Sequence, residues 1–265
     1  MNKIQAAFTN GKAFIPFITA GDPCLETTKE ILLAMQGAGA DVIEIGIPFS
    51  DPIAEGIVIQ EANERALAKG CTTDQIFDML KSSKEQIQVP LVFLTYLNPI
   101  YTYGKEKFMR RCVESGIAGL IIPDLPFEEK AELADVAKEH HIDIISLIAP
   151  TSKERIKMIA KEATGFIYCV SSLGVTGVRE NIKTNIGDMI QQVRSVTSVP
   201  CAIGFGISTP AQAKEMAAMC DGAIVGSAIV NMVAQYGNDC IPYIKEYVKQ
   251  MKEAIQVESS VLTDL

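Results

Sequence analysis

Short apolar runs recur along the chain, and stretches with helical spacing separate them. Eight runs rich in valine, isoleucine and aromatic residues are predicted to be buried strands, and they cover residues 13–21, 41–49, 89–97, 119–126, 142–150, 165–172, 199–207 and 222–230. The segments between them, such as EEKAELADVAKEHH, place apolar residues three and four positions apart, as amphipathic helices do. A strand followed by a helix, repeated eight times over about 250 residues, is typical of a closed (β/α)8 TIM barrel, an α/β fold.

Helix signals between the runs support the same fold. Two helices fit between the second and third strands, in residues 54–70 and 72–86. Another begins with Ser208 and Thr209 as a cap and Pro210 as its first residue. An open doubly wound sheet usually has fewer strands and a GxGxxG turn after the first, which is not found here.

The domain organisation is expected to be simple. No linker or low-complexity segment divides the chain, so residues 1–265 are expected to form one TIM-barrel domain. The patterned core runs from about residue 4 to 255. Residues 257–265 carry no strand or helix pattern and are expected to form a frayed tail.

Composition and charge narrow the class of partner. The chain is 48% hydrophobic and 21% charged, with a net charge of -8 and no cluster of lysine and arginine. This balance argues against nucleic acid and anionic membrane as partners. No apolar run approaches a membrane span, and the first residues lack the pattern of a secretory signal. We therefore expect a cytoplasmic protein that acts on a small molecule.

Cysteine and histidine give little support to a metal site. The seven cysteines are scattered without a CxxC pair, most among apolar neighbours, so they are expected to be reduced and buried. The two histidines, His140 and His141, end a helical stretch, where the helix dipole favours them. Neither a zinc site nor a Ser-His-Asp triad has the side chains it needs, so no metal is predicted.

One acid stands inside a predicted strand. In VIEIGIP, Ile43, Ile45 and Ile47 share one face and suit the layer against the helices, so Glu44 points into the barrel near its carboxyl mouth. Burial raises the pKa of a carboxyl towards neutrality, where it can both give and take a proton. A structural glutamate paired with an interior cation is the competing interpretation. The neighbouring runs show no inward lysine or arginine, which favours a catalytic role.

Glycine clusters mark the last three predicted strands: SSLGVTG follows the sixth strand, GFGIS ends the seventh, and VGSA lies in the eighth apolar run. The loops after strands seven and eight of such barrels frequently bind phosphate, because glycine lets backbone N–H groups approach the anion. Ser227 beside Gly226 adds a hydroxyl donor. Each glycine alone fits an ordinary turn, but three clusters at successive strand ends indicate an enzyme acting on a phosphorylated small molecule.

Several motifs together carry a resemblance to a known family. FITAGDP, EIGIPFSDPIAEG, GVTG, GFGIS and GSAIV resemble the α subunits of tryptophan synthase, in the same order, from about residue 4 to 255. The resemblance implies a lyase of tryptophan biosynthesis that cleaves indole-3-glycerol phosphate to indole and glyceraldehyde 3-phosphate. It implies that Glu44 is the acid–base residue and that Glu55 hydrogen-bonds the indole N–H. The sequence departs from the usual pattern at Glu55, where the family shows aspartate, and at Ser172, where many members carry arginine.

The resemblance also assigns binding residues. It implies that substrate contacts come from Phe17, Ile59, Leu94, Tyr168 and Thr176, and that Thr176 reaches the loop of Glu55. It implies phosphate binding by Gly177, Phe205, Gly206, Gly226 and Ser227. A plain core role also remains open for each apolar residue of the first group.

A partner follows from the same resemblance. The family works as an αββα complex in which the β subunit carries pyridoxal phosphate and consumes the indole, so this chain is expected to need no cofactor. The resemblance places Ser50, Asp51 and Pro52, together with Asn98 and Pro99, against the β subunit.

The sequence is also compatible with three different functions. One is a lyase that releases indole without a β subunit. Another is a barrel that has lost catalysis and only activates its partner, a function supported by Glu55 and Ser172. The last is an isomerase or epimerase from another group of phosphate-binding barrels.

Overall fold

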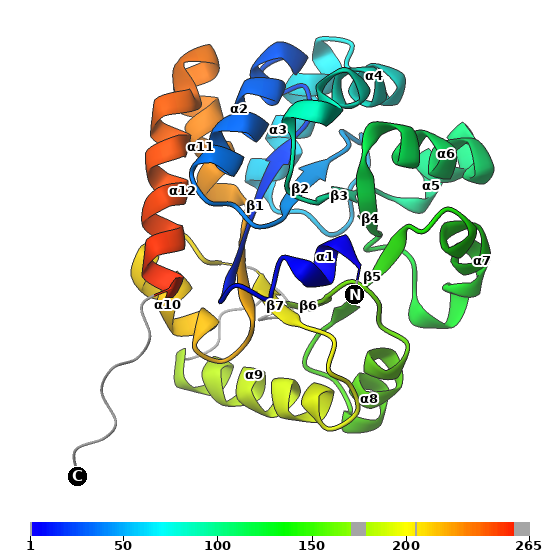
Figure 1. Cartoon of the computed structure of the whole chain (residues 1–265), viewed down its shortest axis with the longest axis vertical. Helices are drawn as coiled ribbons and strands as arrows, with labels where there is room; N and C mark the ends of the chain where they lie inside the picture. Colours follow the sequence, from blue (N-terminus) through cyan, green and yellow to red (C-terminus); the bar gives the residue numbers. More distant parts are fainter. Residues whose placement is uncertain (1, 171–178, 205, 257–265) are drawn as a thin grey trace.

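Eight parallel strands pair in chain order and close into a barrel in the computed structural model, which describes residues 2–170, 179–204 and 206–256 (Figure 1). This confirms the predicted (β/α)8 TIM-barrel class. The strands are β1 (Ala13–Thr19), β2 (Ile43–Gly46), β3 (Leu91–Leu94), β4 (Ile117–Ile121), β5 (Asp143–Ile148), β6 (Ile167–Val170), β7 (Cys201–Gly204) and β8 (Gly222–Val225).

Helices cover the barrel around its outside and at its amino-terminal end (Figure 1). They are α1 (Lys3–Ala6), α2 (Leu25–Gly37), α3 (Ile57–Ala68), α4 (Thr73–Ser83), α5 (Leu97–Tyr103), α6 (Lys105–Ser115), α7 (Ala131–Glu139), α8 (Lys153–Lys161), α9 (Arg179–Arg194), α10 (Pro210–Ala217), α11 (Ser227–Tyr236) and α12 (Ile241–Gln256). Short 3-10 turns lie at η1 (Lys84–Gln86), η2 (Phe127–Glu129) and η3 (Gly237–Cys240). The two helices expected between the second and third strands are α3 and α4.

Capping explains two of the helix starts. Thr209 accepts a hydrogen bond from the backbone N–H of Gln212, whose side chain accepts in return from the backbone of Thr209, and Pro210 is the first helical residue, as predicted. Thr72 forms the same capping box with Gln75 at the start of α4.

The eighth apolar run was predicted as one strand over residues 222–230, and this extent is wrong. The strand β8 ends at Val225, and α11 begins at Ser227 after the cap residue Gly226. Ile229 and Val230 stay buried on the helix, so the run remains apolar although its backbone changes from strand to helix. A short apolar run cannot by itself distinguish a buried strand from a buried helical turn.

Side chains on the strands alternate between two buried layers. Ile43, Ile45 and Ile47 belong to the large cluster between barrel and helices, as predicted. Val42 belongs to the separate interior cluster, so Glu44, two residues later, also points inward. Ile4 of α1 joins the interior cluster, and α1 lies across the amino-terminal end of the barrel (Figure 1). The carboxyl end is therefore the open one.

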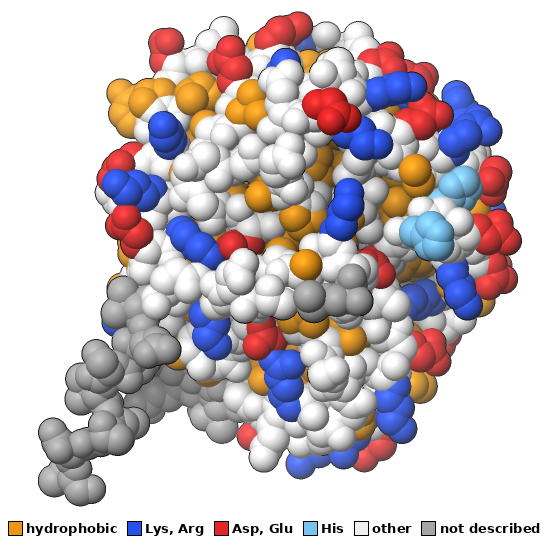
Figure 2. All heavy atoms as spheres, viewed as in Figure 1, with side chains coloured by type: hydrophobic (Ala, Val, Ile, Leu, Met, Phe, Trp, Pro, Cys, Tyr) orange, Lys and Arg blue, Asp and Glu red, His pale blue; other side chains and the backbone are white. Residues whose placement is uncertain are grey.

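The surface shows acidic and basic side chains intermingled over the face drawn in Figure 2. Several surface charges of the described residues form ion pairs: Lys81 with Glu114, Arg155 with Glu128, and Arg111 with Asp78. None of the helices in the described part of the chain has both the length and the hydropathy needed to cross a membrane.

Candidate active site

Glu44 is a buried acid without a balancing cation. It lies on β2, opposite Phe17 of β1 and Val92 of β3, and only 1% of its surface is exposed. Within the described residues, its Oε2 atom has no hydrogen-bond partner and no lysine or arginine pairs with it. Burial, and then the charge of Glu55, raise the pKa of Glu44 from 4.5 to about 8. Glu44 therefore keeps its proton at neutral pH, as the sequence predicted.

Glu55 is half-buried in the loop between β2 and α3. Asn63 Nδ2 donates a hydrogen bond of 2.6 Å to Glu55 Oε2, and the hydroxyl of Tyr96 also bonds this carboxylate. Gln60 Nε2 donates to the backbone oxygen of Glu55 at 2.7 Å. Burial raises the pKa of Glu55, and the bonds from Asn63 and Tyr96 oppose that rise. The carboxylate is thus held by side chains from two separate segments.

The sequence interpretation missed Asn63 and Tyr96. Asn63 lies on α3 between Ala62 and Ala66, on the face that is buried, and a polar residue there was the available signal. Tyr96 follows inward-facing Leu94 by two residues, so strand alternation places it towards the same mouth.

Three apolar residues predicted to bind the substrate lie together at the mouth. Phe17 forms a small buried cluster with Ala62 and Val230, and Ile59 and Leu94 pack against it. Val58, which the sequence interpretation missed, also packs against this cluster. At Gly46 a Cβ atom would lie 2.7 Å from Phe17 Cζ, so the absent side chain leaves the space that the ring occupies. The structure brings these residues together beside Glu44.

Tyr168 lies on β6 and faces the same region. Burial, and then the charge of Glu44, hold the pKa of its hydroxyl well above 10. On the neighbouring strand, a Cβ atom at Gly204 would lie 2.6 Å from two carbons of the Tyr168 ring. Glycine at this position therefore allows the ring to lie across the end of β7.

Two of the predicted phosphate positions mark the ends of β7 and β8. Gly206 has φ of 77°, a backbone conformation that favours glycine. Gly226 caps α11, whose first residue is Ser227. The first backbone N–H groups of α11 carry the positive end of its dipole, the arrangement that binds anions. The predicted residues Thr176, Gly177 and Phe205, and the departure at Ser172, lie outside the described residues.

The predicted partner-facing residues form two adjoining segments. Ser50 Oγ donates to Asp51 Oδ2 at 2.5 Å, in the loop that continues to Pro52. The ring of Phe49, just before this loop, lies 5.2 Å from that of Tyr96, just before α5, which carries Asn98 and Pro99. The two segments therefore meet through an aromatic pair.

Two apolar side chains are exposed beside this segment, Ile53 in the loop and Ile57 at the start of α3. Ile53 is 78% exposed and Ile57 is 66% exposed. Ile53 directly follows Pro52, and Ile57 comes four residues after Ile53.

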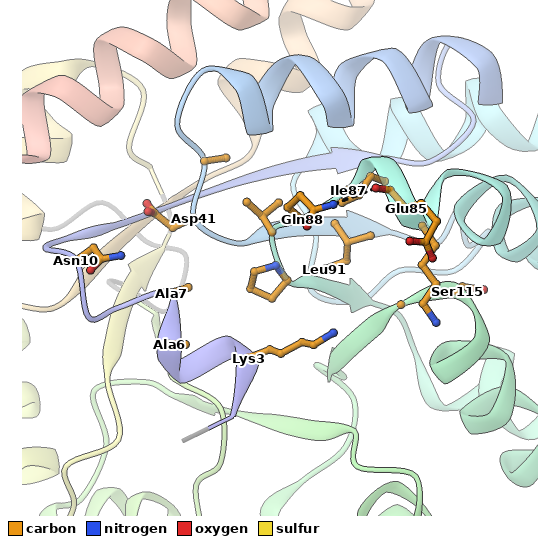
Figure 3. A pocket seen from close by; sticks show the side chains of 15 residues that line it. Lys3, Ala6, Ala7, Asn10, Asp41, Glu85, Ile87, Gln88, Leu91 and Ser115 are labelled. Atoms are coloured by element: carbon orange, nitrogen blue, oxygen red, sulfur yellow. Dashed lines mark hydrogen bonds between the residues drawn. The ribbon is translucent and has the colours of Figure 1, made fainter.

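A cavity of about 620 Å³ opens at the opposite end of the barrel (Figure 3). It is lined by residues that precede the strands, among them Asp41, Gln88 and Ser115, and by Lys3 and Asn10 near α1. It lacks the unpartnered acid and the glycine cluster of the other end. Since active sites of TIM barrels lie at the carboxyl face, the candidate site is the mouth at Glu44.

The parts at the mouth suit one kind of chemistry. Glu44, which holds its proton, and the hydrogen-bonded carboxyl of Glu55 lie beside an apolar wall, and the amino terminus of α11 lies close by because Gly226 packs against Phe17. The described residues contain no group of three histidine, cysteine or acidic side chains placed to hold a metal ion. The arrangement fits proton transfer to a flat apolar ring that carries an anionic tail.

Comparison with known proteins identifies relatives over the whole barrel. The family model described as tryptophan synthase alpha chain matches residues 4–258. The tryptophan synthase alpha chain of Lacticaseibacillus casei is 46% identical over 261 residues, which is 98% of each chain. That of Caldanaerobacter subterraneus is 47% identical, over 96% of this chain and all of the relative. The crystal structure of the alpha chain from Legionella pneumophila is 35% identical with a TM-score of 0.88, and covers 98% of this chain and 100% of its own.

Proposed function

The chain belongs to the tryptophan synthase alpha chain family, lyases that cleave indole-3-glycerol phosphate in tryptophan biosynthesis, and we propose that Glu44 is the acid–base group of this cleavage. The observation that carries the proposal is a buried acid, without a cation, whose pKa lies near 8. Such a group holds a proton at neutral pH and can release it to a substrate.

The bond between indole C3 and the glycerol side chain breaks only when the ring can accept its electrons. Glu44 delivers its proton to C3, which turns the ring into a leaving group. The resulting carboxylate then accepts the proton of the hydroxyl on the adjacent carbon. The C–C electrons return to the ring, and the products are indole and the aldehyde of glyceraldehyde 3-phosphate. Glu44 ends the cycle protonated again.

Glu55 stabilises the ring while it is charged. Its carboxylate, held by Asn63 and Tyr96, accepts a hydrogen bond from the indole N–H. Positive charge on the ring exists only after C3 is protonated, so this bond strengthens in the transition state and lowers the barrier.

The remaining groups orient the substrate. Phe17, Ile59 and Leu94 enclose the indole, while Tyr168 lies beside the glycerol carbons and Glu44. The phosphate binds at Gly206, Gly226 and Ser227, where the amino terminus of α11 supplies N–H donors. Thr176, Gly177 and Phe205 complete the site in the same proposal.

A β subunit is the proposed partner. The exposed Ile53 and Ile57, beside Ser50, Asp51 and Pro52, give the mouth an apolar rim that a partner would cover. Asn98 and Pro99 extend this surface. In an αββα complex the indole passes to the β subunit, whose pyridoxal phosphate serves the next reaction, while this chain uses no cofactor. We place the complex in the cytoplasm.

An indole-release assay tests the proposal. With indole-3-glycerol phosphate as substrate, Glu44→Gln is expected to lose about 100- to 10,000-fold in kcat, because the neutral amide cannot transfer the proton. The matched control is Ser115→Ala, a buried hydroxyl at the far end of the barrel, which should keep its turnover. A barrel that only activates its partner predicts unchanged turnover for Glu44→Gln.

The same assay distinguishes the proposed lyase from an enzyme that acts alone and from a sugar-phosphate enzyme. A lyase that works alone turns over equally fast with and without a β subunit, whereas the proposed complex is faster with it. An isomerase or epimerase would act on simple sugar phosphates in preference to the indole substrate. If no indole is released either with or without the β subunit, the lyase function is refuted.

A further inference from the structure

Asn63 is a buried amide on an otherwise apolar helix face. It is 2% exposed on α3, where Ala62 and Ala66 on the same side are fully buried. A buried amide destabilises the folded chain unless its polar atoms are bonded. Its Nδ2 atom donates to Glu55 Oε2 at 2.6 Å, a short bond to a carboxylate. The chain therefore keeps a polar group in this layer that reaches Glu55.

The helix that carries Asn63 is itself held to the barrel. Arg65 donates to both carboxylate oxygens of Asp22, from Nε at 3.0 Å and from Nη2 at 2.7 Å. Asp22 is 3% exposed and follows β1, the strand of Phe17. A bidentate pair of this kind restricts orientation as well as distance. The position of Asn63 is thus tied to the wall of the mouth.

Glu44 and Glu55 interact as a pair. The charge of Glu55 raises the pKa of Glu44, and two nearby acids tend to share one proton. Glu44 has no described partner for its Oε2 atom, which favours its neutral form. Glu55 accepts hydrogen bonds from Asn63 and Tyr96, which favour its ionised form.

Other titratable and charged groups surround the pair from several elements. Tyr168 faces Glu44 from β6, and Asp124, after β4, adds negative charge near Tyr96. Arg65 is already paired with Asp22. Among the described groups, the donors that reach the carboxylate of Glu55 are therefore Asn63 and Tyr96.

We infer that Asn63 is a positioning residue that assigns the shared proton to Glu44, by holding Glu55 as an ionised carboxylate at the mouth. The inference rests on the proposed roles of Glu44 and Glu55. Without the amide donor, the proton is distributed over both acids. The fraction of enzyme with a proton on Glu44 and a charge on Glu55 then falls, although every catalytic group remains.

Asn63→Leu tests the inference, because leucine has nearly the same shape and lacks the donor. The measurement is the pH profile of kcat for indole release. In the variant, the acidic limb of the profile moves to higher pH, and the rate below neutrality falls by about 10- to 100-fold. Raising the pH recovers much of the loss, because Glu55 ionises again while Glu44 still holds its proton. Asn63→Ala is expected to behave in the same way.

Ser115→Ala is the matched control, since Ser115 is also buried and donates one hydrogen bond, to the backbone oxygen of Phe77 at 3.1 Å. It should lose a similar amount of stability without moving the acidic limb. A limb that stays in place in Asn63→Leu overturns the inference. So does an equal loss of rate at every pH, which would mean that Asn63 has a structural role only.

A titration without substrate separates this inference from the proposed function. In protein with 13C-labelled glutamate carboxyls, the Glu55 resonance is identified by its loss in Glu55→Gln. It should titrate at higher pH in Asn63→Leu than in the unmodified chain. Equal titration overturns the role of Asn63 whatever the activity. Full turnover by Glu44→Gln would instead refute the proposed function, and the titration would still decide whether Asn63 controls Glu55.

Discussion

Replacing Glu44 by glutamine should stabilise the folded chain at neutral and alkaline pH. The pKa of Glu44 is raised from 4.5 to about 8, so between these values the folded chain holds one proton that the unfolded chain has released. Stability therefore falls as pH rises through this window, and the full penalty is present above about pH 8. Glutamine resembles the neutral acid in size and never carries the charge, so the variant escapes the penalty.

The magnitude follows from the shift. One pKa unit corresponds to about 1.4 kcal/mol, and Glu44 is almost completely buried, so solvent screens little of the effect. Between about pH 5 and about pH 8, the variant should gain roughly 3 to 4 kcal/mol over the unmodified chain. This is a large fraction of the stability of an ordinary domain.

Urea denaturation followed by far-ultraviolet circular dichroism measures the gain. Both proteins are unfolded at several pH values, and the difference in free energy of unfolding is plotted against pH. Groups other than Glu44 titrate in both proteins, so most of their contribution cancels. A difference that stays constant over this range would show that Glu44 is not held neutral by burial. The proton source of the proposed mechanism would then be lost.

Three further predictions concern the mouth and the thiols. The alkaline limb of the pH profile of kcat/KM for indole release should lie near pH 8, where Glu44 loses its proton. In Glu55→Gln this limb should move to lower pH, because the charge of Glu55, which helps to raise the pKa of Glu44, is removed. A limb that does not move contradicts the pairing of the two acids. Gly46→Ala should displace the Phe17 ring, raise KM at least about tenfold and cost about 1 to 3 kcal/mol of stability. The control Gly187→Ala should leave KM and stability unchanged, because nothing lies within 4 Å of the new Cβ atom. In the native protein, Ellman's reagent should modify half-buried Cys24 first and Cys71 more slowly, because burial raises the pKa of the Cys71 thiol to about 11; rapid reaction of the five buried cysteines would contradict the packing.

Much of the barrel follows from local pattern. The alternation of Ile43, Ile45 and Ile47 with Val42 and Glu44 assigns each side chain to a layer, because residues two apart in a strand share a face. The eight strands can be predicted from their apolar runs. The end of β8 cannot be predicted, because the apolar run is equally compatible with a strand and with the first turn of α11.

The candidate site divides in the same way. The alternation of its own strand is enough to place Glu44 inside the barrel, and the alternation of their strands is enough to place Phe17 and Leu94 in the apolar wall. The hydrogen-bond partners of Glu55 cannot be predicted in this way. Asn63 follows Glu55 by eight residues, two turns into α3, and Tyr96 comes from beyond the next strand, so no single strand or helix period relates either side chain to the acid.

The order of residues along the chain thus specified which side chains enter the barrel and at which end they lie, because strand and helix periods depend on near neighbours. Folding in three dimensions specified that Glu44 meets no cation and that Glu55 meets two donors. The contact of Tyr96 with Glu55 joins segments far apart in the chain, whereas that of Asn63 joins a loop to the second turn of the helix that follows it. The proton affinity of a buried acid depends on such contacts and on its distance from water. The spacing of apolar residues along one strand or helix specifies neither.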